Sequence, residues 1–307
     1  MRKHFYTVVI ALLTTGYVSA QANLLNATKV DQIGKETQQK IAADNDGPLP
    51  YGYIDDRDIL WSKVVWEYID LNQKINLPYY YPIDTTNIAN NRRSLFDTLL
   101  KSIRKGDIKD VYSDSFFTST VTQAEIEEKL VNIRTTGGFS DTFNIQTRDI
   151  EGYMIKGMWY FDKRQGELKY RLLALAPMGK DVLTLGLADI EDDELYELFW
   201  IFYPSARQVL HDAKVFNPKN VSQPISYDHL LNARRFNAVI VREENVYGNR
   251  SIADYIRGNA LFQLLEADRI KESIRNKKII LQDLSCYKLL GRCLVSFCNC
   301  FVFLVIL

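Results

Sequence analysis

Two short clusters of carboxylates are the first residues whose spacing suggests chemistry. Asp55, Asp56 and Asp58 form one cluster, and residues 191–194, with the sequence EDDE, form the other. Carboxylate oxygens bind Ca²⁺, but a calcium loop alternates its ligands along the chain and turns at a central glycine. Neither cluster has that pattern. We interpret the first as charges that the helix dipole favours at a helix N-terminus, and the second as a solvated loop.

The residue types of common catalytic sites are scarce in this chain. Beyond the N-terminal region the histidines are His211 and His229, and neither has a second histidine or a cysteine at the spacing of metal ligands. The sequence has neither a Gly-x-Ser-x-Gly nucleophile elbow nor a phosphate-binding Gly-x-x-x-x-Gly-Lys loop. It therefore predicts no catalytic residue, no metal ligand and no cofactor site.

All four cysteines, Cys286, Cys293, Cys298 and Cys300, lie near the C-terminus, within residues 277–307. This segment ends in an almost wholly apolar run, and three interpretations compete: a tail anchor, a disulfide or metal cluster, and a shifted reading frame. The cysteines lack histidine or acidic partners, which disfavours a metal site. The abrupt change of composition favours the shifted frame, so we leave this tail out of the fold prediction.

The N-terminus has the parts of a secretory signal peptide over residues 1–20. A basic start at residues 2–4 precedes an apolar run at residues 5–13 that is too short to span a membrane. Small residues then predict cleavage between Ala20 and Gln21. The mature protein is expected to be exported, with no direct membrane span in its folded part.

Composition narrows the class of partner. The 307 residues include 38 basic and 38 acidic side chains, so the formal net charge is zero. This balance gives no electrostatic case for binding nucleic acid. The aromatic share of 12% favours a protein with large packed interfaces.

Hydrophobic patterns predict an α+β fold, with helices packed against an antiparallel sheet, over residues 51–276. Residues 21–50 are polar and read as an extended arm. The stretch after Asp55 or Asp56 is expected to begin as a helix and to become a strand beyond Trp66. Further strands are expected in four places: a hairpin turning at Arg164–Gly166, residues 182–188, a buried central strand in YELFWIFYP, and residues 236–242.

Capping residues predict where the helices begin. These helices are one from Ser94 to Arg104, one opened by the Thr122–Glu125 capping box to about 133, one with Pro204 in its first turn that ends near 213, one capped by Ser226, and a long one opened by Ser251 that buries Ile252, Ile256, Ala260, Leu261, Leu264 and Leu265. Residues 58–76 and 228–246 share a pattern and are each followed by an Arg-Ser pair. This echo suggests a duplicated helix–strand–helix unit.

The aromatic segment that follows residue 65 provides the candidates for contact with another protein. Tyr79, Tyr80 and Tyr81 are consecutive and lie between two prolines, so they cannot all point inward. Tyrosine suits a protein interface because it offers contact area and a hydroxyl group. Trp66 fits either the core or a covered surface. We take these four residues as interface candidates, with burial in the core as the alternative.

Several separated motifs resemble the GldN/PorN family of gliding-motility and type IX secretion proteins of Bacteroidota. They are DDRDILWSKVVWEYIDLNQKINLPYYYP at residues 55–82, LFWIFYPSARQVLHDAKVFNPKN at 198–220 and ENVYGNRSIADYIRGNALFQLLEADRIKESIRN at 244–276. The central hairpin matches as well, so the resemblance covers about 51–276. The tail does not resemble the family's ending, which supports the shifted frame.

The resemblance implies a structural, non-enzymatic protein of the periplasm that binds the outer-membrane lipoprotein GldK/PorK. The two would form a ring at the inner face of the outer membrane, within machinery that includes other motor components and serves type IX secretion and gliding. A secreted carbohydrate-binding or glycan-hydrolysing protein is the alternative. Hydrolysis needs two carboxylates that face each other across a pocket, which the sequence leaves open.

Overall fold

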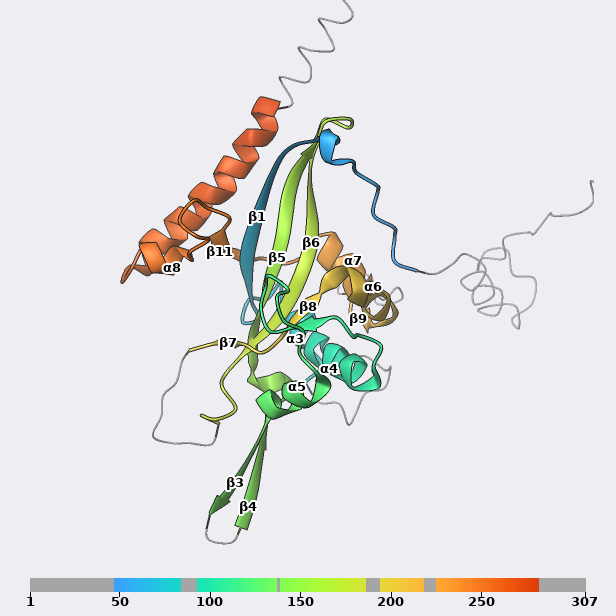
Figure 1. Ribbon diagram of the computed structural model, residues 1–307, viewed down its shortest axis with the longest axis vertical. Helices are drawn as coiled ribbons and strands as arrows, with labels where there is room; N and C mark the ends of the chain where they lie inside the picture. The colour runs from blue at the N-terminus through green and yellow to red at the C-terminus, as the bar shows by residue number, and fades with distance from the viewer. Residues whose placement is uncertain (1–46, 84–92, 137–138, 186–193, 218–224, 282–307) are drawn as a thin grey trace, which may run out of the picture. The chain divides into compact units, whose positions relative to one another are not determined.

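The computed structural model describes residues 47–83, 93–136, 139–185, 194–217 and 225–281 (Figure 1). From Pro48 onward the chain forms one compact unit. Several predictions lie outside the described residues: the signal peptide with its cleavage between Ala20 and Gln21, most of the polar arm, acidic residues 191–193 and the four cysteines.

One antiparallel sheet runs through the centre of the described chain. Its strands follow the order β11–β1–β5–β6–β8–β2, and β7 pairs with β6. The bounds are β1 Ile59–Asp70, β2 Val111–Tyr112, β5 Ile150–Asp162, β6 Glu167–Gly179, β7 Tyr196–Glu197, β8 Trp200–Phe202 and β11 Val239–Glu243. Strands β5 and β6 form the predicted hairpin, with Asp162 opposite Glu167 at its turn. The antiparallel α+β prediction is confirmed.

Two small ribbons lie apart from this sheet. Strand β3 (Val131–Thr136) pairs with β4 (Phe139–Asn144), and β9 (Lys214–Val215) pairs with β10 (Ile225–Ser226). The β3–β4 ribbon begins where helix α5 (Gln123–Leu130) ends, and Figure 1 shows it extending away from that helix.

The remaining helices largely begin where their capping residues predict. They are α3 Leu77–Tyr80, α4 Leu95–Lys105, α6 Tyr203–Asp212, α7 Tyr227–Asn232, α8 Ile252–Tyr255 and a helix at residues 260–281, with 3₁₀ turns at Asp56–Asp58 and Thr147–Asp149. Ser94 and Ser226 cap α4 and α7, and Thr122 forms the capping box of α5. Gly106 ends α4 with a left-handed φ of 82°. Among the described helices, none combines the length and the apolar character needed to cross a bilayer.

Helices and loops bury both faces of the sheet. On one face, α3, α4, α6 and α7 pack over β5 and β6 around Leu95, Tyr153 and Tyr203. On the same face nearer β11, the helix at 260–281 packs against Val65. On the opposite face Trp66 packs with residues of β5, β6 and β8. Because the middle of the sheet is covered on both sides, its strands carry apolar residues in succession rather than in strict alternation.

The predicted helix after Asp55 is wrong. The side chain of Asp55 accepts a hydrogen bond from Arg57 N, but the turn it caps is a single 3₁₀ turn that leads directly into β1. Strand β1 pairs with β5 along its whole length, from Ile59 to Asp70. Val65 packs on one face of the sheet and Val64 on the other, so two adjacent residues are apolar. Adjacent apolar residues also occur on the buried side of a helix, which is why the sequence pattern indicated one.

The prediction for the last helix is also wrong about which of its side chains are buried. Ser251 does open a helix, but α8 stops at Tyr255, and Gly258 with φ of 73° precedes a new helix. This break rotates the second helix, which buries Ala267, Ile270 and Ile274. The leucines predicted to be buried at its start, Leu261, Leu264 and Leu265, are exposed, as is Ala260, while Ile252 is buried as expected.

Two further expectations are corrected. Residues 182–185 form a turn rather than a strand, with Thr184 N bonded to Asp181 O. The duplicated helix–strand–helix unit is not present, because residues 59–70 are one continuous strand whereas residues 227–232 form α7 ahead of β11. The stretch YELFWIFYP is buried at Trp200 as predicted, but its strand β8 is short and lies next to the edge strand β2 rather than at the centre.

Two glycines of β5 lie beneath tyrosine rings of the neighbouring strands. A Cβ atom built on Gly152 would collide with the ring of Tyr68 in β1, and one built on Gly157 would collide with the ring of Tyr170 in β6. Each tyrosine thus covers the space that a side chain would otherwise fill. The rings lie diagonally across the ladder, which is within reach of an aromatic side chain.

We predict that Gly157→Ala lowers the free energy of unfolding by about 1–3 kcal/mol, because Tyr170 must leave its position. Gly52→Ala is the matched control, since its new Cβ meets nothing within 4 Å, and it should change stability by less than about 0.5 kcal/mol. Urea denaturation followed by circular dichroism measures both. Equal midpoints for the two variants would contradict the close packing of Tyr170 on Gly157.

Candidate functional site

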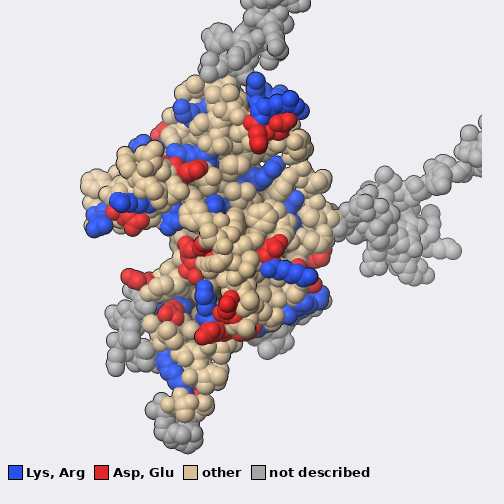
Figure 2. Space-filling model, viewed as in Figure 1, with Lys and Arg blue, Asp and Glu red and all other residues tan. Residues whose placement is uncertain are grey.

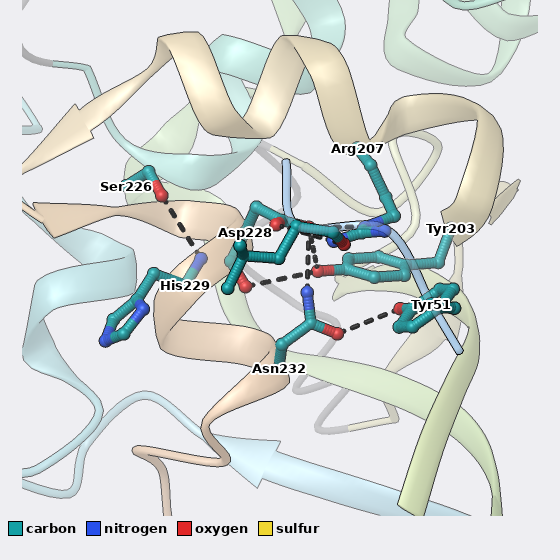
Figure 3. A network of polar contacts seen from close by, with 8 residues as sticks. Tyr51, Tyr203, Arg207, Ser226, Asp228, His229 and Asn232 are labelled. Atoms are coloured by element: carbon teal, nitrogen blue, oxygen red, sulfur yellow. Dashed lines mark hydrogen bonds and ion pairs between the residues drawn. The ribbon is translucent and has the colours of Figure 1, made fainter. Parts of the chain in front are cut away.

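Helices α6 and α7 bring a buried arginine and a buried aspartate together (Figure 3). The Nε atom of Arg207 lies 2.9 Å from Oδ1 of Asp228, and a terminal nitrogen lies 3.1 Å from Oδ2. Both side chains are almost fully buried. The two parallel bonds form a bidentate pair, the strongest geometry for an arginine and a carboxylate.

Two more donors complete the shell of Asp228. The hydroxyl of Tyr203 donates to Oδ1 at 2.8 Å, and the amide of Asn232 donates to the same atom at 2.9 Å. Burial, and then the charge of Asp228, raise the pKa of Tyr203, so this hydroxyl remains a donor. Four hydrogen bonds thus reach this one carboxylate. The arrangement joins α6 to α7.

The network holds the extended segment that precedes β1. The Tyr51 hydroxyl donates to Oδ1 of Asn232 at 2.9 Å. Its ring centroid lies 4.2 Å from the guanidinium carbon of Arg207 and 4.7 Å from that of Arg171. The same two arginines donate to main-chain carbonyls on either side, at Leu49 and Gly52. The segment at 49–52 is therefore fastened through both its side chain and its backbone.

Trp66, an interface candidate from the sequence, is only 3% exposed. Its ring packs against Phe116 with centroids 5.8 Å apart, and the ammonium of Lys156 lies 5.1 Å from its centroid. That ammonium also donates to the carbonyl of Ser115 at 2.7 Å, and burial lowers its pKa. Lys156 thus fastens the loop that covers Trp66, and Trp66 presents no contact surface in this conformation.

The three consecutive tyrosines divide between core and surface. Tyr79 is 1% exposed and packs against Tyr227 and Phe236, and burial raises its pKa. Tyr80 is half-buried, and Tyr81 is 53% exposed, with their ring centroids 5.1 Å apart. The short helix α3 turns these side chains in different directions. The expectation that at least one tyrosine is exposed is confirmed, whereas Tyr79 belongs to the core.

Two acids of the cluster at the start of β1 each pair with an arginine. Asp58 pairs with Arg164 at 2.6 Å and Asp55 pairs with Arg57 at 3.0 Å. His229, one of the two histidines considered from the sequence, lies in α7, where its main-chain nitrogen donates to the cap Ser226. Across the described ranges, no group of three histidine, cysteine or acidic residues is placed to hold a metal ion. Figure 2 shows basic and acidic side chains interspersed over the visible face.

Sequence reasoning missed the network around Asp228. One signal was available: Arg207 lies between Tyr203 and Leu210 on one face of α6, at spacings of four and three residues. A charged residue on the buried face of a helix needs a buried partner of opposite charge. That rule predicts the existence of a partner, but only the packing of α7 identifies it.

Comparison with protein families gives a match over most of the chain. The model of a family described as "Gliding motility associated protein GldN" matches residues 54–281, which is more than half of the chain. The matched range includes the whole central sheet, the Arg207–Asp228 pair and the helix at 260–281, including residues 277–281 that we assigned to the tail. No curated protein matches the chain.

We predict that Arg207→Ala lowers the free energy of unfolding by about 3–5 kcal/mol, because it leaves the Asp228 carboxylate buried without its cation. The control is Arg164→Ala, which removes an exposed arginine from an ion pair of similar length and should cost less than about 1 kcal/mol. Denaturant titration of both variants separates a fixed structural pair from a surface pair. Comparable losses would mean that the Arg207–Asp228 pair adds no more stability than an exposed one.

Proposed function

The chain belongs to the GldN family of gliding motility associated proteins, and on that basis we propose that it is a structural component of the type IX secretion and gliding machinery in the periplasm. In this role it binds a GldK/PorK-like outer-membrane lipoprotein, and the two build a ring at the inner face of the outer membrane. Its part in the machinery is to assemble with other proteins, without enzymatic activity.

The family match carries this proposal, and the chemistry of the buried polar groups supports it. Among the described residues, the most buried charged pair, Arg207 with Asp228, is satisfied from within the chain, as is the Glu67–Arg234 pair with two bonds of 2.9 Å. Catalytic acids and bases need a free position toward a substrate. Side chains that are directed at each other instead stabilise a scaffold.

Exposed aromatic surface supports a role in protein contacts. Tyr81 presents more than half of its side chain, and Tyr80 supports it edge to face. A few aromatic anchors carry much of the affinity of a protein interface. We assign the Tyr80–Tyr81 surface to the lipoprotein contact, which retains part of the predicted aromatic interface after the burial of Trp66 and Tyr79.

The experiment is an affinity pull-down of the full chain from membranes, followed by mass measurement of its partners and of the particle. A lipoprotein in a high-mass particle is expected. Tyr81→Ala should weaken lipoprotein binding about thirtyfold, which corresponds to about 2 kcal/mol for one anchor. The control is Tyr53→Ala, which removes another exposed tyrosine and should leave binding unchanged.

Circular dichroism on the same samples separates loss of contact from loss of fold. Tyr81→Ala should melt like the parent chain, whereas Tyr79→Ala should unfold at a lower temperature because it empties a core position. Normal binding by a folded Tyr81→Ala variant would refute the assignment of this surface. Recovery of a small particle without lipoprotein, or with glycan-hydrolysing activity, would refute the ring component itself.

A further inference from the structure

The helix at residues 260–281 carries two faces that differ in what covers them. Its inner face packs Ala267, Ile270 and Ile274 against Val65 of β1 and Ile240 of β11. The opposite face begins with Leu261, Leu264 and Leu265, which are 63%, 47% and 54% exposed. Spacings of three and four residues place these leucines in one stripe. The first turns of this helix are therefore apolar on the side that faces away from the sheet.

This apolar stripe continues into a charged one. Farther along the outer face come Asp268, Glu272, Arg275 and then Ile279, all of them exposed. Arg275 pairs with Glu272 inside the helix at 2.6 Å, with both side chains largely in solvent. Such a surface pair contributes little stability, so its members can change partners at small cost.

A groove of about 550 Å³ borders this stripe. The helix supplies Asp268, Lys271 and Arg275 to one wall, and the sheet supplies Trp159 and Leu168 to the other. The Glu67–Arg234 pair and the apolar Ile240 and Ile274 line it as well, so the groove presents both apolar and charged side chains. An occupant that matches it must offer apolar side chains beside alternating charges.

We propose that this occupant is the same helix of a second copy of the chain, packed antiparallel across a two-fold axis. In the register that places Asp268 opposite Arg275 of the second copy, Glu272 lies opposite Lys271 and Leu264 lies opposite Ile279. All three pairs arise when the two-fold axis crosses the helix midway between residues 271 and 272. A two-fold contact repeats each pair, so every copy offers both the leucines and the groove.

The register also gives the leucines defined neighbours. Leu264 of the second copy comes opposite Ile279, and Leu265 comes opposite Lys278, which lines the groove. The apolar Leu264 meets Ile279, and opposite charges meet along the middle of the helix. The contact uses none of the Tyr80–Tyr81 surface, and it stands or falls independently of the proposed lipoprotein binding.

The first test is the mass of the purified full chain in solution, measured by light scattering over a range of concentrations. A monomer–dimer equilibrium is expected. The double variant Leu264→Glu with Leu265→Glu should raise the dissociation constant at least tenfold. Ile133→Glu, on the β3–β4 ribbon, is the control because it alters an exposed apolar residue elsewhere, and it should leave the equilibrium unchanged.

A charge exchange tests the register. Asp268→Arg should weaken the dimer, because each copy would then face Arg275 of the other with a like charge. Adding Arg275→Asp in the same chain should restore it. All of these positions are exposed, and circular dichroism confirms that each variant folds.

Three outcomes overturn the proposal. One is a chain that stays monomeric at every concentration, since no second copy would then cover the stripe. Another is a particle of any size that the leucine variant does not change. The last is a double charge variant that associates no better than Asp268→Arg alone.

Discussion

The antiparallel ladder of β1, β5 and β6 is the constraint on which the rest of the structure depends. Its register directs Val65 and Ile69 to one face and Trp66 and Tyr68 to the other, since successive side chains of a strand point to opposite sides. Each face is buried against different elements. A slip of one residue would exchange the two sets of side chains, so the register is strongly specified.

The ladder also determines where the charged side chains can lie. Tyr170 covers Gly157, and its hydroxyl donates to Glu67, which holds Arg234 ahead of β11 with two further bonds. Ion pairs of this kind are costly to bury and are kept where both partners are fully bonded. They connect segments that are far apart in the chain.

The surfaces left uncovered lie on separate elements. Tyr81 follows α3, whereas the exposed leucines begin the helix at 260–281. Isolated apolar residues on a surface are ordinary, and the proposed contact between two copies rests instead on a stripe along one helix face next to a groove. The two proposed contacts share no residue, so neither competes with the other for a side chain.

Local rules determined much of this protein from its sequence: Ser94, Thr122 and Ser226 cap helices, Gly106 ends one, and residues 163–166 turn a hairpin. These features depend on a few neighbouring residues. Only the tertiary structure decided that residues 59–70 form a strand, that Tyr79 is buried beside the exposed Tyr81, and that Asp228 is the partner of Arg207. The reason is physical: burial on both faces of a sheet erases the alternation that identifies a strand, and partners distant in sequence meet only when the sheet brings their elements together.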